Sequence, residues 1–412
     1  MNSRHGNCKG FHVPVPKGRP GEAADFSEIF IPPAGKLAKP EPDVNPDAIR
    51  DYAFDLIRVL DENDDGVGEW KPRLSPAELL AGLRAVMLTR EYDNRMLRVQ
   101  RQGKTSFYMK STGEEAVSVA AAMALRHDDM CFPTYRQQGI LIARQWPLVD
   151  MMNQVFSNSG DRLKGRQMPV FYSTREGAFF SISGNLGTQY SQAVGWGLAA
   201  AADGDPRIAA AWIGDGATAE SDFHYALTFA SVYQSPVVLN IVNNQWAISS
   251  FAGVAGGERS TFASRGLGFG IPSLRVDGND FLAVYEVTAW AAERARSGNG
   301  PTIIEHFTYR AEGHSTSDDP SKYRAGSDAS GWPLGDPIER LKRHLVRLGQ
   351  WDEARHAQLK NELEEEVRQS LKQAEAQGTL GRPGALDPKS MFDDVYKEMP
   401  SHLEAQRAQL SS

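Results

Sequence analysis

The sequence predicts an α/β protein in which a parallel sheet is flanked by helices on both faces. Two short runs, at residues 207–213 and 236–242, are mostly apolar, a third strand is expected at 301–308, and stretches with helical periodicity lie between them. Apolar strands of this kind are typical of sheets that are buried on both faces, and their alternation with helices favours parallel pairing.

An extended arm is expected before this sheet. Eight prolines lie within the first 47 residues, so we interpret residues 1–47 as an extended arm that either crosses a partner subunit or forms a loose tail. The Pro-rich N-terminal arm as a whole is assigned to residues 1–74. Within it, Asp61–Gly66 resembles the first half of a calcium-binding loop of the EF-hand type. Pro72 occupies the twelfth position, where such a loop needs a glutamate, so we interpret the segment as a solvated acidic turn.

The α/β domain is expected over residues 75–330, and its helices follow from capping and periodicity. Ser75 precedes Pro76 and, three residues on, Glu78, which is the pattern of a capped helix start. The expected helices span 76–101, 113–125, 189–202, 218–233 and 280–297.

A C-terminal helical region is expected over residues 331–412. Residues 336–378 are charged and have helical periodicity, which predicts helices on the outside of the protein. The stretch 391–399 combines apolar and acidic residues, and we expect it to dock on a core.

Composition and charge exclude several classes of protein. The net charge is −7, so the chain lacks the basic excess of a protein that binds nucleic acid without sequence preference. The two cysteines, Cys8 and Cys131, exclude a disulfide framework and favour a reducing compartment, and no Cys/His cluster predicts a zinc site. No signal peptide, transit peptide or run of 18 apolar residues occurs, so we expect a soluble, cytoplasmic protein.

The sharpest feature for function is Gly214-Asp215-Gly216, which is followed one helix and one strand later by Asn243-Asn244. Each motif comes directly after one of the apolar runs. Because a right-handed βαβ unit places these strands parallel, Asp215 and Asn244 are expected to emerge at the same carboxyl edge of the sheet. Open α/β sheets bind their ligands at this edge.

The residue types at this edge suit a magnesium ion bound to a diphosphate. A carboxylate and an amide oxygen are hard ligands, and Mg²⁺ is usually held by one or two side chains together with water and phosphate oxygens. Gly214 and Gly216 allow phosphates to approach the backbone, and the helix expected near Thr218 directs free N–H groups to the same place. Neither a GxGxxG dinucleotide fingerprint between a strand and a helix nor a GxxxxGK[ST] phosphate loop is present.

The pair of motifs resembles the thiamine diphosphate motif, and residues 75–400 resemble the E1 α subunits of the branched-chain 2-oxoacid dehydrogenase complex. The Pro-rich arm is similar to that of the bacterial members. The segments that carry the resemblance are Ser106–Met109, Gly113–Glu115, Pro133–Arg136, Lys164–Pro169, Gly214–Asp222, Asn243–Ser249, Tyr309–Arg310 and His314–Asp319. Pyruvate dehydrogenase α subunits typically have HSMSDP in place of His314–Asp319 and YGMG in place of Trp246–Ser249, so the branched-chain family is preferred.

The resemblance implies a thiamine diphosphate-binding fold and a set of site residues. Mg²⁺ would be bound by Asp215, Asn244 and the main-chain oxygen of Trp246. Leu186 would buttress the bent cofactor, and the guanidinium of Arg136 offers a planar fork for phosphate oxygens. The cofactor-binding residues implied are Tyr135, Arg136, Leu186, Gly214, Gly216, Ala217 and His314.

Two positions depart from the pattern of the animal members. Ser183, Asn185, Thr188 and Gln189 match the K⁺ loop of the family, but Asn185 replaces a common proline, which puts the K⁺ ion in question. Val242 occupies the position of an arginine that contacts the diphosphate in those members, so one positive contact is missing.

His314 is the catalytic residue that the resemblance implies on this chain. We expect it to steady the diphosphate or the reacting intermediate and to exchange a proton near neutral pH. Ser315 matches a serine that a kinase regulates in animal members, and we interpret it here as a loop residue.

The activity of the family needs a second chain. In thiamine diphosphate enzymes a glutamate binds the aminopyrimidine ring, and in two-chain E1 enzymes it lies in a β subunit. No second doubly wound domain is apparent here, and Glu114 and Glu115 are interpreted as structural or interfacial. The resemblance therefore implies that the site forms between α and β in an α2β2 heterotetramer.

Such a heterotetramer would act as a 3-methyl-2-oxobutanoate dehydrogenase, an oxidoreductase of branched-chain amino acid catabolism. It would decarboxylate the 2-oxo acids derived from Val, Leu and Ile and pass the acyl group to the lipoyl group of an E2 protein. A pyruvate or acetoin dehydrogenase α subunit is the alternative within the family. A Mg²⁺-dependent phosphate-ester hydrolase would need further carboxylates at the strand ends, and a non-catalytic assembly subunit would not need Asp215, Asn244 and His314. No nucleic acid or membrane partner is expected.

Overall fold

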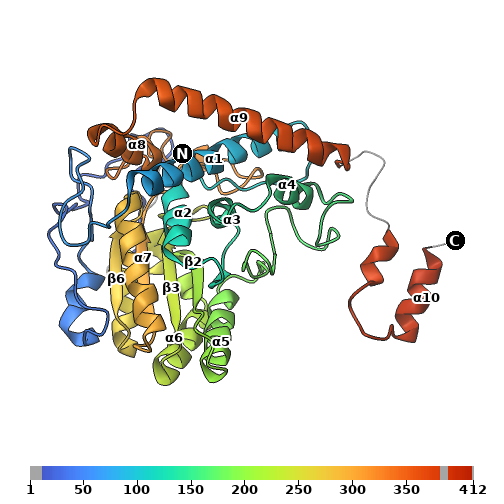
Figure 1. Ribbon diagram of the computed structural model, residues 1–412, viewed down its shortest axis with the longest axis horizontal. Coiled ribbons are helices and arrows are strands. Elements are labelled where there is room, and N and C mark those ends of the chain that lie inside the picture. Colours follow the sequence, from blue (N-terminus) through green and yellow to red (C-terminus); the bar gives the residue numbers. More distant parts are fainter. Residues whose placement is uncertain (1–11, 381–387, 411–412) are drawn as a thin grey trace.

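The structure is a computed structural model that describes residues 12–380 and 388–410. Its centre is a five-stranded sheet in which all neighbouring strands are parallel, in the order β1-β2-β3-β7-β6. The strands are β1 (Met130–Phe132), β2 (Ala209–Gly214), β3 (Val237–Asn243), β6 (Ser273–Asp277) and β7 (Thr302–Phe307). The expected α/β class with a parallel sheet is confirmed (Figure 1).

Helices cover the sheet, and the longest helices of the N- and C-terminal parts lie across one end of it (Figure 1). The first helix begins as expected, because Ser75 Oγ accepts from Glu78 N and Glu78 Oε2 accepts from Ser75 N, which is a capping box. The helices are α1 (Pro76–Arg101), α2 (Glu115–Ala124), α3 (Gln138–Ala143), α4 (Leu148–Phe156), α5 (Thr188–Ala202), α6 (Ser221–Tyr233), α7 (Phe281–Arg296), α8 (Pro337–Arg347), α9 (Glu353–Ala376) and α10 (Ser401–Gln409).

Side chains of the central strands alternate between two apolar cores. Ala209, Ala211 and Ile213 of β2 belong to the core that includes α5 and α6. Ala210 and Trp212 belong to the core that includes α1, α2 and α7. This period of two, with apolar residues on both sides, explains why the strands are unbroken apolar runs in the sequence.

The turn after β2 differs from the sequence prediction. The sequence predicts one helix over 218–233, whereas the structure has a short 3-10 turn at Gly216–Ala219 and a separate α6 from Ser221. Asp215 bends the chain here, because its main-chain oxygen accepts from the Thr218 hydroxyl at 2.5 Å. The sequence analysis also did not identify β1, β6, α3 and α4.

The second half of the expected N-terminal arm packs on the protein's own sheet. Ile57 forms a parallel bridge with Val276 of β6, and Val59 N and Leu60 N donate to the Asp280 carboxylate at 2.8 and 2.6 Å. This contact covers the β6 edge, which would otherwise expose unpaired backbone groups. The alternatives of an arm on a partner subunit or a loose tail concern residues 1–47, and this contact at residues 57–60 does not decide between them.

The acidic turn in this region binds arginines of α8. The Asp64 carboxylate contacts Arg343, and Asp65 contacts Arg347 Nη2 at 2.5 Å. These ion pairs give the acidic cluster a partner in the protein's own C-terminal region.

Residues 388–410 do not dock on a core, contrary to the expectation for 391–399. Met391, Val395 and Tyr396 are each more than half exposed. The segment makes polar contacts with the rest of the chain, among them Lys164 Nζ to Asp394 Oδ2 at 2.5 Å. Figure 1 shows α10 apart from the sheet and the other helices.

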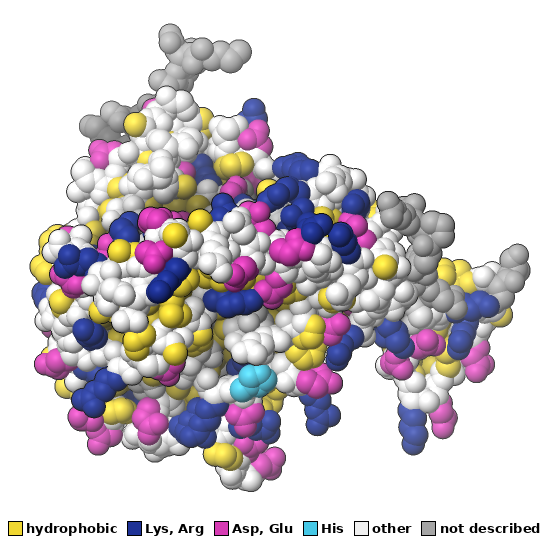
Figure 2. Space-filling model, turned by 45° about the horizontal axis from the view of Figure 1, so that its top comes forward, with side chains coloured by type: hydrophobic (Ala, Val, Ile, Leu, Met, Phe, Trp, Pro, Cys, Tyr) yellow, Lys and Arg dark blue, Asp and Glu magenta, His cyan; other side chains and the backbone are white. Residues whose placement is uncertain are grey.

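The surface is mixed in charge. On the face shown in Figure 2, Lys and Arg side chains are interspersed with Asp and Glu. Among the residues described, no helix is both long enough and apolar enough to cross a membrane.

Candidate active site

The two sequence motifs meet at the carboxyl ends of β2 and β3, where they line a cleft of about 240 Å³. This cleft brings together the residues that the sequence analysis selected for cofactor and magnesium, which come from five separate segments of the chain. Those that line it are Tyr135, Arg136, Leu186, Gln189, Gly214, Asp215, Gly216, Ala217, Asn244, Trp246 and His314.

The Gly214–Ala217 turn is packed too closely for any side chain at Gly216. A Cβ atom there would lie 2.4 Å from Ala247 Cβ, whereas one at Gly214 would meet nothing within 4 Å. The close approach at Gly216 brings the turn after β2 against the segment that carries Asn244 and Trp246. The free space at Gly214 leaves the backbone open to the cleft, as a bound phosphate would require.

Asp215 lies fully buried with half of its carboxylate unused. Its Oδ1 accepts from Gly216 N at 2.7 Å, while Oδ2 has no hydrogen-bond partner in the described part of the chain. Burial raises the pKa of Asp215 to about 7, and the neighbouring Glu114 carboxylate contributes in the same direction. An orphaned buried carboxylate oxygen beside a second carboxylate fits a divalent cation, so the donor set agrees with Mg²⁺.

The Asn244 side chain is held at both of its polar atoms. Its Nδ2 donates to Glu114 Oε1 at 2.7 Å, and its Oδ1 accepts from Trp246 N at 3.2 Å. The main-chain oxygen of Trp246 accepts from Arg310 Nη1 at 3.1 Å, which leaves it one lone pair for a cation. The three expected ligands of Mg²⁺ are thus present on the same cleft.

Arg136 is buried in the wall of the cleft, and most of its donors are engaged. Nη1 donates to the Lys110 carbonyl at 2.6 Å, and Nη2 contacts His314 Nδ1 at 3.0 Å and the His314 carbonyl at 2.6 Å. Its Nε lies 3.9 Å from Glu114 Oε1. The three hydrogen bonds use one N–H of Nη1 and both of Nη2, so the second N–H of Nη1 and the N–H of Nε remain for phosphate oxygens.

His314 is a neutral ring in this setting. Burial, together with the positive charges of Arg136 and Arg310, lowers the pKa of His314 to about 3. Because a guanidinium only donates, Nδ1 accepts from Arg136 and the proton lies on Nε2. In this arrangement the ring offers an Nε2–H donor to the cleft, and proton exchange by His314 stays a prediction.

Tyr135 completes the wall between Arg136 and His314. Its ring stacks on Phe171 with centroids 6.2 Å apart and meets the His314 ring edge-on at 5.8 Å. The Arg136 guanidinium lies 5.4 Å from the centre of the Tyr135 ring. Leu186 stands at the mouth of the cleft with 41% of its surface exposed, which leaves it free to contact a bound cofactor.

The loop expected to bind K⁺ is ordered by its own hydrogen bonds. Thr188 Oγ1 donates to the Asn185 carbonyl at 2.8 Å, and Ser183 Oγ accepts from Asn185 N at 3.1 Å. Gln189 accepts from Gly187 N and donates to the Trp212 carbonyl at 2.8 Å, so both ends of its amide are engaged. Of these four residues, only Gln189 lines the cleft.

Sequence reasoning missed several residues of the cleft. Glu114 is the most important, because we interpreted it as a structural or interfacial residue, yet its carboxylate is buried against Asn244. A glutamate at the start of a helix carries no local signal for such a contact, since Asn244 is 130 residues away. The other cleft residues that we did not select as binding residues are Thr134, Gln137, Glu220, Val242, Ala247 and Ile248.

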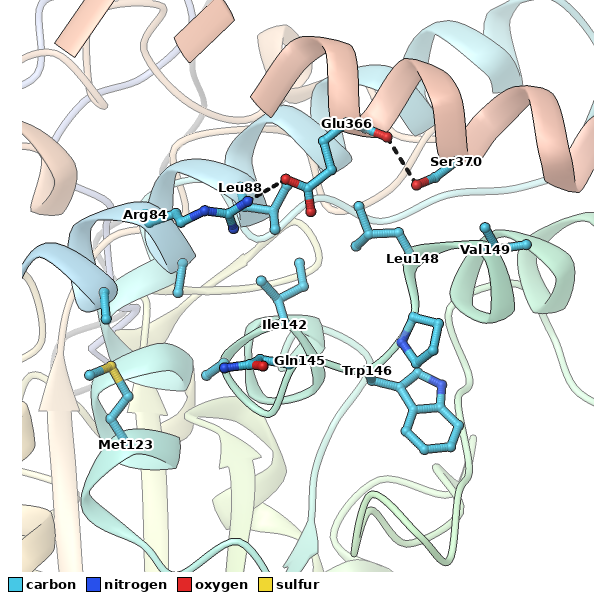
Figure 3. Close-up of a pocket in the computed structure, with 14 residues that line it drawn as sticks. Arg84, Leu88, Met123, Ile142, Gln145, Trp146, Leu148, Val149, Glu366 and Ser370 are labelled. Atoms are coloured by element: carbon cyan, nitrogen blue, oxygen red, sulfur yellow. Dashed lines mark hydrogen bonds and ion pairs between the residues drawn. The ribbon is translucent and has the colours of Figure 1, made fainter. Parts of the chain in front are cut away.

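A larger cavity, of about 730 Å³, lies away from these motifs between α1, α3, α4 and α9. Figure 3 shows that apolar side chains such as Ile142, Leu148 and Leu88 surround it, while Arg84 of α1 binds Glu366 of α9 on one side. It lacks the convergent polar groups that mark a site for chemistry. The smaller cleft with its buried carboxylates is therefore the candidate active site.

Comparison with known proteins gives consistent matches over most of the chain. The family model described as dehydrogenase E1 component matches residues 83–382, and the model described as 2-oxoisovalerate dehydrogenase E1 alpha subunit N terminal matches residues 10–47. The chain is 60% identical over 399 residues to 2-oxoisovalerate dehydrogenase subunit alpha of Pseudomonas aeruginosa, which covers 97% of each chain. It is 38% identical over 358 residues to the mitochondrial 2-oxoisovalerate dehydrogenase subunit alpha of Homo sapiens, which covers 86% of this chain and 79% of that one.

Proposed function

Because the chain belongs to the dehydrogenase E1 component family, we propose that it is the α subunit of a thiamine diphosphate-dependent E1 enzyme for branched-chain 2-oxo acids. The enzyme decarboxylates these acids oxidatively and passes the acyl group to the lipoyl group of an E2 protein. The single observation that carries this proposal within the structure is the buried, half-free Asp215 carboxylate, which faces the same cleft as the locked Asn244 amide.

The residues of the cleft divide the binding of the cofactor among them. When bound, thiamine diphosphate supplies the carbon nucleophile for the 2-oxo group and stabilises the electron pair left when CO₂ departs. Asp215, Asn244 and the Trp246 carbonyl are proposed to hold Mg²⁺, which would neutralise the diphosphate. The backbone of Gly216 and Ala217 and the free N–H groups of Arg136 would bind phosphate oxygens.

His314 and Tyr135 act by position in this proposal. Arg136 fixes the tautomer of His314, so its Nε2–H is available to donate to a phosphate or substrate oxygen without a change of protonation state. Tyr135 packs between Phe171 and His314 and holds that ring in place. The chain therefore contributes charge neutralisation and orientation, which are electrostatic and entropic contributions to the rate.

A β subunit is the proposed source of the missing glutamate for the aminopyrimidine ring. The two buried carboxylates of the cleft are not free for this role, because Glu114 is bound to Asn244 and Asp215 is proposed as a metal ligand. An exposed aromatic face of α6, which we call the α6 face, supports a partner beside the cleft. It comprises Tyr225, Phe229, Val232 and Tyr233, whose exposed fractions run from 54% to 67%.

Several finer properties belong to this proposal as well. We place the enzyme in an α2β2 assembly in the cytoplasm. Exposed apolar side chains grouped on one helix face are typical of interfaces, and α6 follows the Gly214–Ala217 turn of the cleft in the chain, so a β subunit on this helix would lie on the element next to the cofactor site. We keep K⁺ in the proposal as a second ion, bound at the Ser183–Gln189 loop. Hydrogen bonds within the loop already hold its conformation.

The test is decarboxylation of 3-methyl-2-oxobutanoate by this chain co-expressed with a β subunit. Thiamine diphosphate, Mg²⁺ and an artificial electron acceptor complete the assay, and pyruvate and the α chain alone are the comparisons. Turnover of the branched substrate by the pair, and not by the α chain alone, is the expected result. Preferential turnover of pyruvate would overturn the substrate, and no thiamine diphosphate-dependent turnover of any 2-oxo acid by a verified assembly would overturn the function.

A further inference from the structure

Glu114 joins the two halves of the candidate site. Its Oε1 accepts from Asn244 Nδ2 at 2.7 Å, and the same oxygen lies 3.9 Å from Arg136 Nε. The side chain is 2% exposed, so the contact is shielded from water. A buried carboxylate with these neighbours has one strong hydrogen bond, to the amide, and one longer electrostatic contact, to the guanidinium.

The backbone around Glu114 is held in place by contacts of its own. Gly113 has φ +96° and lies so close to the Tyr309 carbonyl that a Cβ atom would be 2.2 Å from it. The Gly113 carbonyl accepts from the Thr308 hydroxyl at 3.0 Å, and Glu114 N donates to the Ser111 carbonyl at 2.8 Å. Glu114 is thus anchored to the end of β7, next to the strand that leads to Asn244.

The chemistry of the contact fixes which way the Asn244 amide faces. A carboxylate only accepts hydrogen bonds, so the amide must turn its NH₂ group to Glu114. The backbone N–H of Trp246 only donates, and it meets Oδ1 at 3.2 Å, so it requires the same orientation. If the amide were flipped by 180°, its oxygen would face the Glu114 carboxylate and its NH₂ group would face the Trp246 N–H, so neither hydrogen bond could form. Oδ1, with its second lone pair, is therefore the atom left for a cation.

We propose that Glu114 is a positioning residue that holds the Asn244 amide with its oxygen, and not its nitrogen, available to the divalent cation of the site. This inference rests on the proposed function, because the cation is the one that Asp215 and Asn244 are proposed to bind with thiamine diphosphate. Partners that orient a metal ligand typically change metal affinity by 10–100-fold when they are removed.

Two substitutions of similar size separate the orienting role from a packing role. Glu114→Gln keeps an oxygen that can accept from Asn244 Nδ2, whereas Glu114→Met fills the space and offers no comparable acceptor. Glu115→Gln is the matched control, because Glu115 is equally buried at the next position but binds Arg90 Nε at 2.7 Å outside the cleft. Its other oxygen accepts from Gly113 N at 2.9 Å, and the amide oxygen of glutamine can keep that contact. Glu114→Ala is the second variant if the Met variant does not assemble.

The measurement is the Mg²⁺ concentration that gives half-maximal thiamine diphosphate binding, followed by tryptophan fluorescence in the assembled α and β chains. We expect Glu114→Met to raise this Mg²⁺ concentration by about 10–100-fold and Glu114→Gln to raise it much less. Glu115→Gln should leave the Mg²⁺ concentration unchanged. An unchanged value in the Met and Ala variants, or equal increases in the Gln and Met variants, would overturn the inference. Absence of Mg²⁺-dependent binding in the unsubstituted enzyme would instead overturn the proposed function, so the two failures are distinguishable.

Discussion

Gly216→Ala is expected to disable the candidate site through a single steric overlap. The added Cβ would lie 2.4 Å from Ala247 Cβ. Carbon atoms pack at about 3.5–4.0 Å, so the Gly214–Ala217 turn and the segment with Asn244 must separate by roughly 1 Å. A shift of this size at a reacting centre costs on the order of 10²-fold in rate, which corresponds to about 2.7 kcal/mol.

The reciprocal change at Ala247 makes this prediction specific. In the double variant Gly216→Ala with Ala247→Gly, the overlapping atom is removed, so cofactor affinity and kcat should return most of the way. Both are measured in the assembled enzyme, by titration with thiamine diphosphate at fixed Mg²⁺ and by decarboxylation of 3-methyl-2-oxobutanoate. An active single variant, or a double variant as impaired as the single one, would refute the steric reasoning.

Three further predictions use other features of the chain. Asp215→Asn should not lower the melting temperature of the cofactor-free protein in EDTA, because it removes a buried carboxylate whose Oδ2 has no hydrogen-bond partner among the described residues. The variant should lose the rise in melting temperature that thiamine diphosphate with Mg²⁺ gives the unsubstituted protein. If that rise is retained, the role of Asp215 is contradicted. His306 is buried, which lowers its pKa from 6.5 to about 3, so between these values the unfolded chain binds a proton that the folded chain excludes. The free energy of unfolding should thus fall with decreasing pH by up to about 1.4 kcal/mol per pH unit, less steeply in His306→Gln, and equal slopes would show that this histidine is not responsible. Phe229→Glu on the α6 face should prevent co-purification with the β chain without changing the melting temperature of the α chain. Val346→Glu on the distant α8 should leave both co-purification and melting temperature unchanged. Normal assembly of the Phe229 variant would show that α6 is not part of the interface.

The central strands were predictable because their signal is local. The apolar runs at 207–213 and 236–242 correspond to β2 and β3 within two residues at each end. Both faces of these strands are buried, so nearly every position is apolar and no long-range information is needed. The position of Asp215 and Asn244 on one edge followed from the parallel direction of the two strands, which a βαβ crossover requires.

The edge strands were not predictable, because they lack this local apolar signal. β1 has only three residues, and β6 contains Arg275, whose charge interrupts the apolar pattern. In the fold, the Arg275 guanidinium lies over the Phe307 ring at 4.1 Å and beside the Glu305 carboxylate at 3.4 Å. Both partners belong to β7, so the contact that makes the arginine acceptable exists only after the sheet has formed.

The main residues that line the candidate site were predictable from the sequence, but the residues that support them were not. Asp215 and Asn244 stand in recognisable motifs, whereas Glu114 acts through a contact 130 residues away. His314 was correctly placed in the cleft, but its low pKa depends on burial and on Arg136, which no local pattern reveals. A separate α6 start at Ser221 depends on the Asp215–Thr218 hydrogen bond, which interrupts an otherwise continuous helical pattern.

The α6 face has a consequence for the life of the chain in the cell. A chain synthesised in excess of its partner would expose four large apolar side chains on one helix. Such surfaces recruit chaperones and promote aggregation, and the unassembled fraction is removed by proteases. The abundance of this chain should therefore follow the supply of its proposed partner, so that sufficient production of that partner becomes a condition for accumulating this chain.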